Sequence, residues 1–136
     1  PTAHTYLNRF LAAAEATDKQ KHLAKYLSEI MLLHVDFIRF VPSMCAATSV
    51  FYMRLLTVKS YSGDDEKVWT RTLEHYTDYL EVDLHECCEL LYKKHCGAKT
   101  HELRAVYEKF SATAFDFVSE IEPLSMLPFS SPSSSS

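Results

Sequence analysis

The sequence predicts an all-α domain, and three observations support that prediction. Only two of its 136 residues are glycine, which is few for a protein built from turns and sheet. Apolar residues recur at helical spacing in most segments up to Phe110. The segment 42–58 carries no charged side chain before Arg54, which is typical of a helix buried on every side. We therefore expect the helices, about five to six of them, to pack around a central apolar helix at about residues 42–59.

Two amphipathic helices are expected before the central one. Thr2 can cap the first, which is expected to run to about Glu15. The second is expected from about residue 18 to 34, after a capping box in which Thr17 and Gln20 each accept a hydrogen bond from the other's backbone. The linker that follows is expected to pack onto the core through three apolar side chains: Phe37, Ile38 and Phe40.

Three shorter helices are expected after the polar loop 60–67. Thr70 caps the first of them, with Leu73 and Tyr76 pointing inward. The next is expected at about residues 81–95, followed by a glycine stop at Gly97.

The end of the chain divides into three parts. Thr100 is expected to cap the last helix, which ends near Phe110. Residues 115–129 are apolar and are expected to lie extended across the helices. Residues 130–136, rich in serine, are expected to be a disordered tail. The first 129 residues are thus predicted to form one domain.

Charge, apolar run length and cysteine spacing argue against nucleic-acid binding, a membrane span and disulfides. The net charge of −4 argues against nucleic acid, because contacts to phosphates need a basic face. A membrane span needs roughly 18 to 20 apolar residues, and Arg54 interrupts the longest candidate. The four cysteines show no regular spacing, so reduced thiols in the nucleus or cytoplasm are expected.

Four segments of this sequence resemble segments of one known protein family. The chain opens with PTAHTYLNRFLAAA, and residues 23–58 read LAKYLSEIMLLHVDFIRFVPSMCAATSVFYMRLLTV. Residues 68–91 read VWTRTLEHYTDYLEVDLHECCELL, and residues 102–128 read ELRAVYEKFSATAFDFVSEIEPLSMLP. In this order the segments resemble the C-terminal cyclin fold of mitotic, A- or B-type cyclins, including the W-T-x-T-L-x-x-Y-T-x-Y run.

The resemblance implies a non-catalytic function. This chain is expected to be a fragment of a two-box cyclin, the regulatory subunit of a cyclin-dependent kinase in cell-cycle control. The C-terminal fold would support an N-terminal kinase-binding box, which this sequence does not contain. The alternative is a cyclin-fold transcription factor domain, whose basic face this acidic chain lacks. Leu80 departs from the family, which often has a serine-like cap there, so the helix after it is expected to fray or start late.

The resemblance also points to an interdomain surface. The first helix, next to the interdomain linker, is expected to contact the N-terminal box through Tyr6, Leu7 and Phe10, although an amphipathic helix can equally cap its own domain. If that contact exists, the isolated chain exposes apolar surface and is expected to self-associate.

Other motifs are interpreted as structural. The sequence Met53-Arg54-Leu55-Leu56 resembles the substrate-docking motif of an N-terminal box, but in this fold its position is in the core. Histidine and cysteine cluster at five positions that do not form the paired ligands of a zinc site, so no metal and no cofactor is expected: His85, Cys87, Cys88, His95 and Cys96. Catalysis needs a nucleophile with a nearby base and an oxyanion site; no such arrangement is visible, so no enzyme is expected.

Ser131 precedes a proline in the tail and is a candidate phosphorylation site for a proline-directed kinase.

Overall fold

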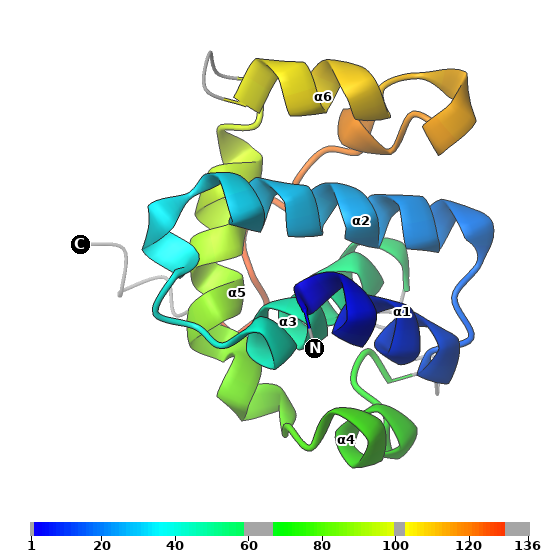
Figure 1. Cartoon of the computed structure of the whole chain (residues 1–136), viewed down its shortest axis with the longest axis vertical. Helices are drawn as coiled ribbons and strands as arrows, with labels where there is room; N and C mark the ends of the chain where they lie inside the picture. The colour runs from blue at the N-terminus through cyan, green and yellow to red at the C-terminus, as the bar shows by residue number, and fades with distance from the viewer. Residues whose placement is uncertain (1, 59–66, 100–102, 130–136) are drawn as a thin grey trace.

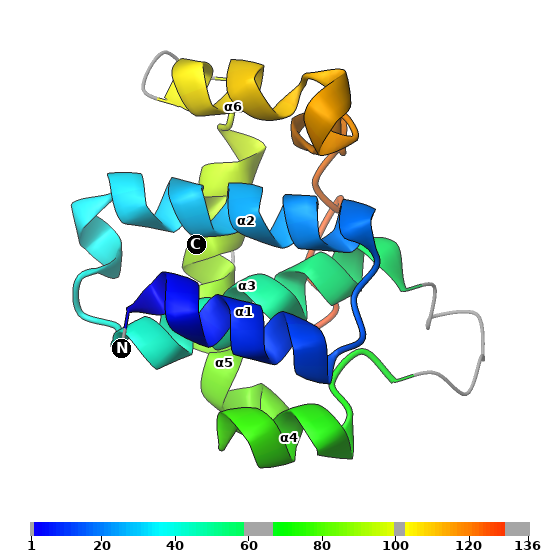
Figure 2. The same ribbon diagram turned by 45° about the vertical axis from the view of Figure 1, so that its right-hand side comes forward.

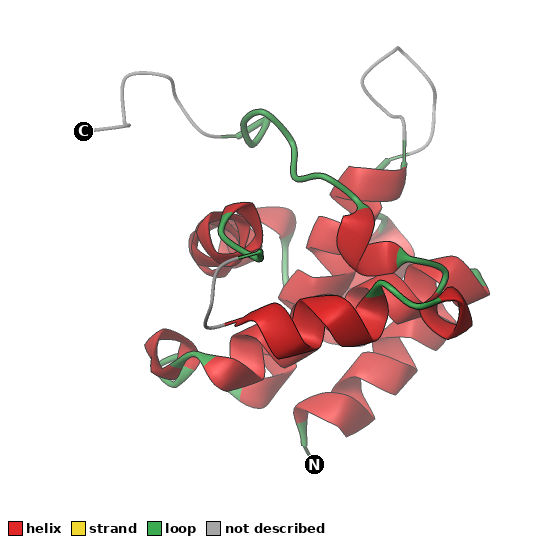
Figure 3. Cartoon of the chain, turned by 90° about the horizontal axis from the view of Figure 1, so that it is seen from above, coloured by secondary structure: helices red, strands yellow, loops and turns green. Residues whose placement is uncertain are grey.

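The computed structural model of this chain describes residues 2–58, 67–99 and 103–129. These residues form helices and loops and no strand (Figure 3). The α-helices are α1 (Ala3–Ala13), α2 (Asp18–Leu33), α3 (Pro42–Thr57), α4 (Arg71–Thr77), α5 (Glu81–Cys96) and α6 (Arg104–Phe110). Three short 3-10 helices complete the described part: η1 (Val35–Phe37), η4 (Thr113–Phe115) and η5 (Val118–Glu120). The all-α prediction is confirmed.

Helix α3 is the centre of the fold. All residues from Ala46 to Leu55 are buried, on every side of the helix. It packs against α1, α2 and α5, while α4 and α6 lie at opposite ends of the molecule (Figures 1 and 2). The small side chains of Ala46 and Ala47, both fully buried, allow the surrounding helices to approach closely. The prediction of a central apolar helix is therefore confirmed.

The helix starts predicted at Thr2, Thr17 and Thr70 are also confirmed. The Thr2 hydroxyl accepts a hydrogen bond from the backbone N–H of Thr5 at 3.3 Å, and Thr70 caps α4 in the same way. The backbone N–H of Gln20 donates to the Thr17 hydroxyl at 3.1 Å, and that of Thr17 donates to the Gln20 side chain at 3.0 Å. Each such cap stabilises a helix by about 1 kcal/mol.

Helix α5 begins at Glu81 although Leu80 offers no capping side chain. Asp83 replaces the missing cap from inside the helix, because its carboxylate accepts the backbone N–H of Leu80 at 2.8 Å. The expected fraying or late start is therefore wrong. Gly97 follows the helix end as predicted.

Two side chains expected to point inward are exposed. Tyr76 is 58% exposed because α4 has only seven residues and buries one narrow side, which carries Leu73 and Thr77. Ile38 is 83% exposed, whereas Phe37 beside it is buried. The η1 turn directs Phe37 into the core and leaves Ile38 outside. Both inward predictions are wrong.

The segment after α6 is less extended than expected. Residues 113–120 form η4 and η5, separated by Asp116 and Phe117 with φ of 57° and 56°. Beyond them the chain lies across the helices as predicted, with Leu127 buried. The Tyr92 hydroxyl donates to the Leu124 carbonyl at 2.6 Å and fixes this segment to α5.

The sequence Met53-Arg54-Leu55-Leu56 lies in the core, as predicted. Met53 and Leu55 are buried, and the Arg54 guanidinium donates to the carbonyls of Val68 and Lys67 at 2.6 and 2.9 Å. No described helix has the length and apolar character needed to cross a bilayer. The expectations for Thr100, for the loop 60–67 except Lys67 and for the tail 130–136 lie outside the described residues.

Candidate interaction surface

An apolar groove of about 830 Å³ lies where the end of α2 turns toward the start of α3. Its side chains come from the C-terminal half of α2, from η1, from the connection to α3, from the first turn of α3 and from the start of the chain at Thr2 and Ala3. This surface, the α2–α3 groove, is lined by thirteen residues: Thr2, Ala3, Ser28, Met31, Leu32, Leu33, His34, Val35, Phe37, Ile38, Phe40, Pro42 and Cys45.

The groove is unusual because large apolar side chains stand in solvent around it. Leu32, Val35 and Ile38 are 73%, 75% and 83% exposed, and Leu33 and Val41 are also exposed. A run of apolar residues this exposed on one side of a small domain marks an interaction site more often than a bare surface. The α2–α3 groove is therefore the strongest candidate interface among the described residues.

Ion pairs hold this connection in place. Lys94 on α5 is 3.0 Å from the Asp36 carboxylate, and Glu86, also on α5, pairs with Arg39. The Arg39 guanidinium also lies over the ring of Phe40, at 4.4 Å. The charged side chains of the segment contact α5, whereas its apolar side chains at Val35 and Ile38 face outward. The exposed apolar surface is thus held in a defined shape.

Two of the three residues predicted for the interdomain surface, Leu7 and Phe10, lie in the core of the domain instead. Leu7 and Phe10 are only 1% and 2% exposed, because they pack against α3 inside the domain. Tyr6 is half-buried and carries the Arg9 guanidinium over its ring at 5.9 Å. Leu7 and Phe10 are therefore core residues and not available surface. A contact between this region and another domain stays a prediction, with Tyr6 as the accessible residue of the three.

One feature of the sequence indicates the groove: a run of apolar residues that is longer than the apolar stripe of the helix. Four apolar residues follow one another from Ile30 to Leu33, which is more than the regular apolar stripe of one helix face requires. Ile30 and Met31 are buried and Leu32 and Leu33 are exposed. The apolar residues at the end of the helix that exceed the buried stripe are the feature from which the groove could be predicted.

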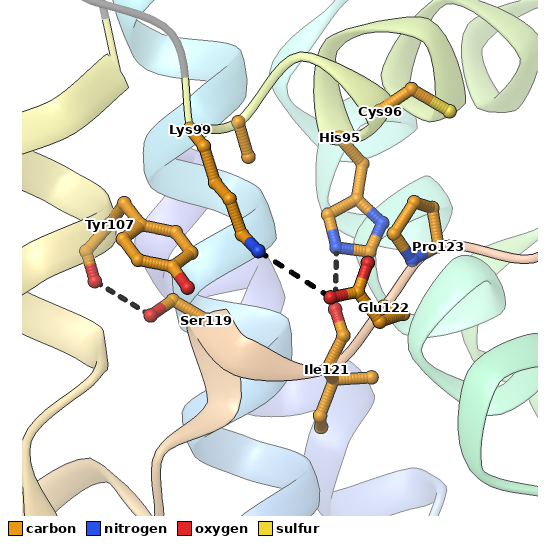
Figure 4. A pocket seen from close by; sticks show the side chains of 9 residues that line it. His95, Cys96, Lys99, Tyr107, Ser119, Ile121, Glu122 and Pro123 are labelled. Carbon is orange, nitrogen blue, oxygen red and sulfur yellow. Dashed lines mark hydrogen bonds and ion pairs between the residues drawn. The ribbon is translucent and has the colours of Figure 1, made fainter.

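A second, smaller pocket surrounds His95 near the end of α5. It has a volume of about 90 Å³ and is lined by residues of α5, α6 and the segment after η5 (Figure 4). Lys99 pairs with Glu122 at 3.5 Å across it, and the Ser119 hydroxyl donates to the Tyr107 carbonyl at 2.6 Å. These two contacts connect the end of α5 and α6 to the C-terminal segment beside the pocket.

His95 itself is a buried structural residue. Its Nε2 donates to the Ile121 carbonyl at 3.2 Å, which leaves Nδ1 to accept the Tyr52 hydroxyl proton at 2.7 Å. Burial lowers the pKa of His95 from 6.5 to about 4, although the Ile121 carbonyl and Glu122 act in the opposite direction. The imidazole is therefore neutral at physiological pH and joins α3, α5 and the C-terminal segment.

The other described histidines and cysteines do not gather into a metal site. His85 stacks on the Phe129 ring at 3.9 Å and contacts Glu81 at 3.1 Å. In the part of the chain that the structure describes, no three His, Cys, Asp or Glu side chains are close enough to hold one metal ion.

Comparison with known proteins identifies the family. The profile of the family described as "Cyclin, C-terminal domain" matches residues 1–124. The chain belongs to the cyclin C-terminal domain family. Its match covers all of the helices and the start of the segment that crosses them, in agreement with the resemblance of the four sequence segments.

Mitotic cyclins are among the similar curated proteins. The cyclin domain is 36% identical over 122 residues to Cyclin-B2-1 of Arabidopsis thaliana, covering 90% of this chain and 27% of that protein. It is 34% identical to G2/mitotic-specific cyclin-2 of Medicago sativa, covering 93% of this chain and 37% of that protein. It is also 34% identical to G2/mitotic-specific cyclin-A of Hydra viridissima, with 93% and 29% covered. This cyclin domain thus spans 27% to 37% of the length of these relatives.

Proposed function

We propose that this cyclin domain belongs to a non-catalytic regulatory subunit of a cyclin-dependent kinase that acts in the mitotic cell cycle. The similarity to B-type and G2/mitotic-specific cyclins over nearly the whole chain is the observation that supports this function. A subunit with this function would work in the nucleus, the cytoplasm or both. No observation favours the alternative of a DNA-contacting transcription factor, and the net charge of −4 argues against it.

Within such a subunit, we propose that the domain supports an N-terminal cyclin box through the α2–α3 groove. The relatives are at least about two and a half times as long as this chain, so they contain sequence beyond the matched region. Thr2 and Ala3 line the groove, and any segment preceding them would emerge beside it. Covering Leu32, Val35 and Ile38 would remove their apolar surface from water, a gain of about 25 cal/mol per Å² from which the cost of association is subtracted.

The proposed function is tested by comparing this chain with an upstream-extended form of the same protein. Both are mixed with a panel of cyclin-dependent kinases, and binding and phosphorylation of a model substrate are measured. We expect only the extended form to bind and activate a kinase. If the extended form binds none of the kinases, the regulatory function is contradicted. If the short chain binds a kinase without the upstream extension, its supporting role is contradicted.

We also propose that the partner kinase phosphorylates Ser131. This residue precedes Pro132, the minimal site for a proline-directed kinase. Phosphopeptide mapping of the protein after incubation with its active kinase should find phosphate on Ser131 and none after Ser131→Ala. An unmodified Ser131 would overturn this proposal and leave the proposed function intact.

A further inference from the structure

Residues 121–129, the strap, run along α5 in the direction opposite to that of the helix. They follow η5 and contain no helix and no strand. The strap begins at the level of His95, where the Ile121 carbonyl is bonded. It reaches the level of His85, about three turns away on α5, where the Phe129 ring lies. The orange-red end of the ribbon in Figures 1 and 2 follows this path.

The helix α5 holds the first part of the strap by its backbone. The Ile121 carbonyl accepts a hydrogen bond from Nε2 of His95 at 3.2 Å. The Leu124 carbonyl accepts one from the Tyr92 hydroxyl at 2.6 Å. Every residue has a backbone carbonyl that can accept such a bond. These two donors therefore recognise the path of the strap and not the identity of its side chains.

The end of the strap is held by two of its own side chains. Leu127 is only 1% exposed and belongs to the hydrophobic core. The Phe129 ring lies parallel to the His85 ring, with centroids 3.9 Å apart, and also stacks on Phe51 of α3 at 6.0 Å. A segment that makes these contacts carries an apolar side chain and, two residues later, an aromatic ring.

The aromatic part of this site does not depend on the strap for its shape. His85 contacts the Glu81 carboxylate, one turn earlier on α5, at 3.1 Å. Phe51 is fully buried and meets the Trp69 ring edge to face at 5.8 Å. In addition, α3 and α5 pack directly against each other. None of these contacts uses Phe129, so the site is preorganised, which lowers the cost of binding a ligand there.

The strap is attached more loosely than the helices are. Among the described residues, no backbone-to-backbone hydrogen bond involves residues 122–129, and Met126 is 48% exposed. Segments with few such contacts open locally before the rest of a domain unfolds. The family profile matches residues 1–124, so Leu127 and Phe129 lie beyond the matched region. The side chains that fix the end of the strap are thus an addition to the matched domain.

We propose that the strap is a releasable intramolecular ligand, and that the site it leaves on α3 and α5 binds a segment of another protein with the same pattern. That segment gives its carbonyls to His95 and Tyr92 and places an aromatic ring on His85. Because the strap is tethered, its effective concentration at the site is on the order of millimolar, and a partner competes with it. None of these three residues lines the α2–α3 groove, so the inference goes beyond the proposed function.

Binding of a free strap peptide to the whole chain tests the proposal. The probe is a fluorescein-labelled peptide with the sequence of residues 121–129, IEPLSMLPF, and its binding is followed by fluorescence anisotropy. Phe129→Ala weakens the chain's own strap, so this variant should bind the peptide at least roughly tenfold more tightly than the wild type does. Met126→Ala changes an exposed side chain of the strap and should bind the peptide as weakly as the wild type.

Two further changes place the peptide at the proposed site. His85→Ala, added to Phe129→Ala, should remove the gain in affinity, because the peptide's ring loses the imidazole on which it stacks. A peptide that ends in alanine should likewise bind Phe129→Ala at least roughly tenfold more weakly than the probe does. If Phe129→Ala loses the helical circular dichroism of the wild type, Phe129→Leu takes its place, since leucine keeps an apolar side chain there without the stacked ring.

Three results would overturn the proposal. The first is equal affinity of the wild type and the folded Phe129 variant for the peptide, including no binding by either. The second is a gain in affinity that survives His85→Ala. The third is equal binding of the peptide that ends in alanine. Because no kinase and no upstream extension are present in this experiment, its failure is distinct from failure of the proposed function.

Discussion

The Tyr52 hydroxyl donates a hydrogen bond of 2.7 Å to Nδ1 of His95, and both side chains are buried. This bond joins the central helix to α5. The other ring nitrogen of His95 reaches the Ile121 carbonyl, so one side chain connects three parts of the fold. Two predictions follow from this arrangement.

The stability of the domain should fall between about pH 6.5 and pH 4. His95 has a folded-state pKa of about 4 and an ordinary pKa of 6.5, so in this interval the unfolded chain binds a proton that the folded chain does not. The contribution of neutral His95 is complete above pH 6.5 and is lost as pH falls, by about 3 kcal/mol at most. Urea unfolding at pH 7.0 and pH 4.5 measures the difference.

The variant His95→Gln isolates this effect, because glutamine can donate to Ile121 and accept from Tyr52 without titrating. We expect it to flatten the pH dependence, whereas His4→Gln, at an exposed position, should leave it unchanged. If the free energy of unfolding changes equally with pH in the wild type and in His95→Gln, His95 does not cause the loss of stability at low pH.

Removing the Tyr52 hydroxyl should destabilise the domain with little change in shape. In Tyr52→Phe the buried Nδ1 of His95 loses its donor, which costs about 1 to 3 kcal/mol. The variant Tyr76→Phe is the control, because that side chain is 58% exposed. Thermal unfolding that gives the same midpoint for both variants would contradict a buried Tyr52–His95 bond.

Enlarging Ala47 should disturb the centre of the fold. The residue is fully buried on α3, and overpacking a core position costs about 1 to 3 kcal/mol or more. Ala47→Phe should lower the melting temperature by several degrees, while Ala105→Phe, at an exposed position on α6, should leave it nearly unchanged. An unaltered melting temperature for Ala47→Phe would mean that no helix faces this position.

The isolated chain should self-associate through the α2–α3 groove. The exposed side chains of Leu32, Val35 and Ile38 favour burial against a second copy when no other partner covers them. Sedimentation velocity at increasing concentration should show dimers or larger species, and Ile38→Glu should reduce them. Val82→Glu removes a similarly exposed apolar side chain away from the groove and should not. A strictly monomeric wild-type chain would contradict this prediction.

The sequence predicted the helices well because their ends carry local chemical signals. Thr2, Thr17 with Gln20, and Thr70 cap helices by contacts within three residues, and such contacts depend little on the rest of the fold. The central helix was equally predictable, since a segment without charge in a chain of this composition must be enclosed.

The surface was less predictable because exposure depends on which neighbours each element has. Tyr76 and Leu73 both follow the helical period, yet only Leu73 meets the core. Conversely, the Leu7 and Phe10 side chains expected at an outer surface fill the space beside α3. The groove arises from a short turn, η1, that places Phe37 inside and Ile38 outside, and no periodic pattern specifies that turn.

The most direct test of the central claim is kinase activation by the upstream-extended protein carrying Ile38→Glu. A carboxylate at this position should be harmless in the isolated domain, where Ile38 is exposed, but should disrupt a covered groove by burying a charge. We predict at least roughly tenfold weaker activation for Ile38→Glu and wild-type activation for Val82→Glu. Full activation by Ile38→Glu would contradict the claim that the α2–α3 groove supports the kinase-binding box.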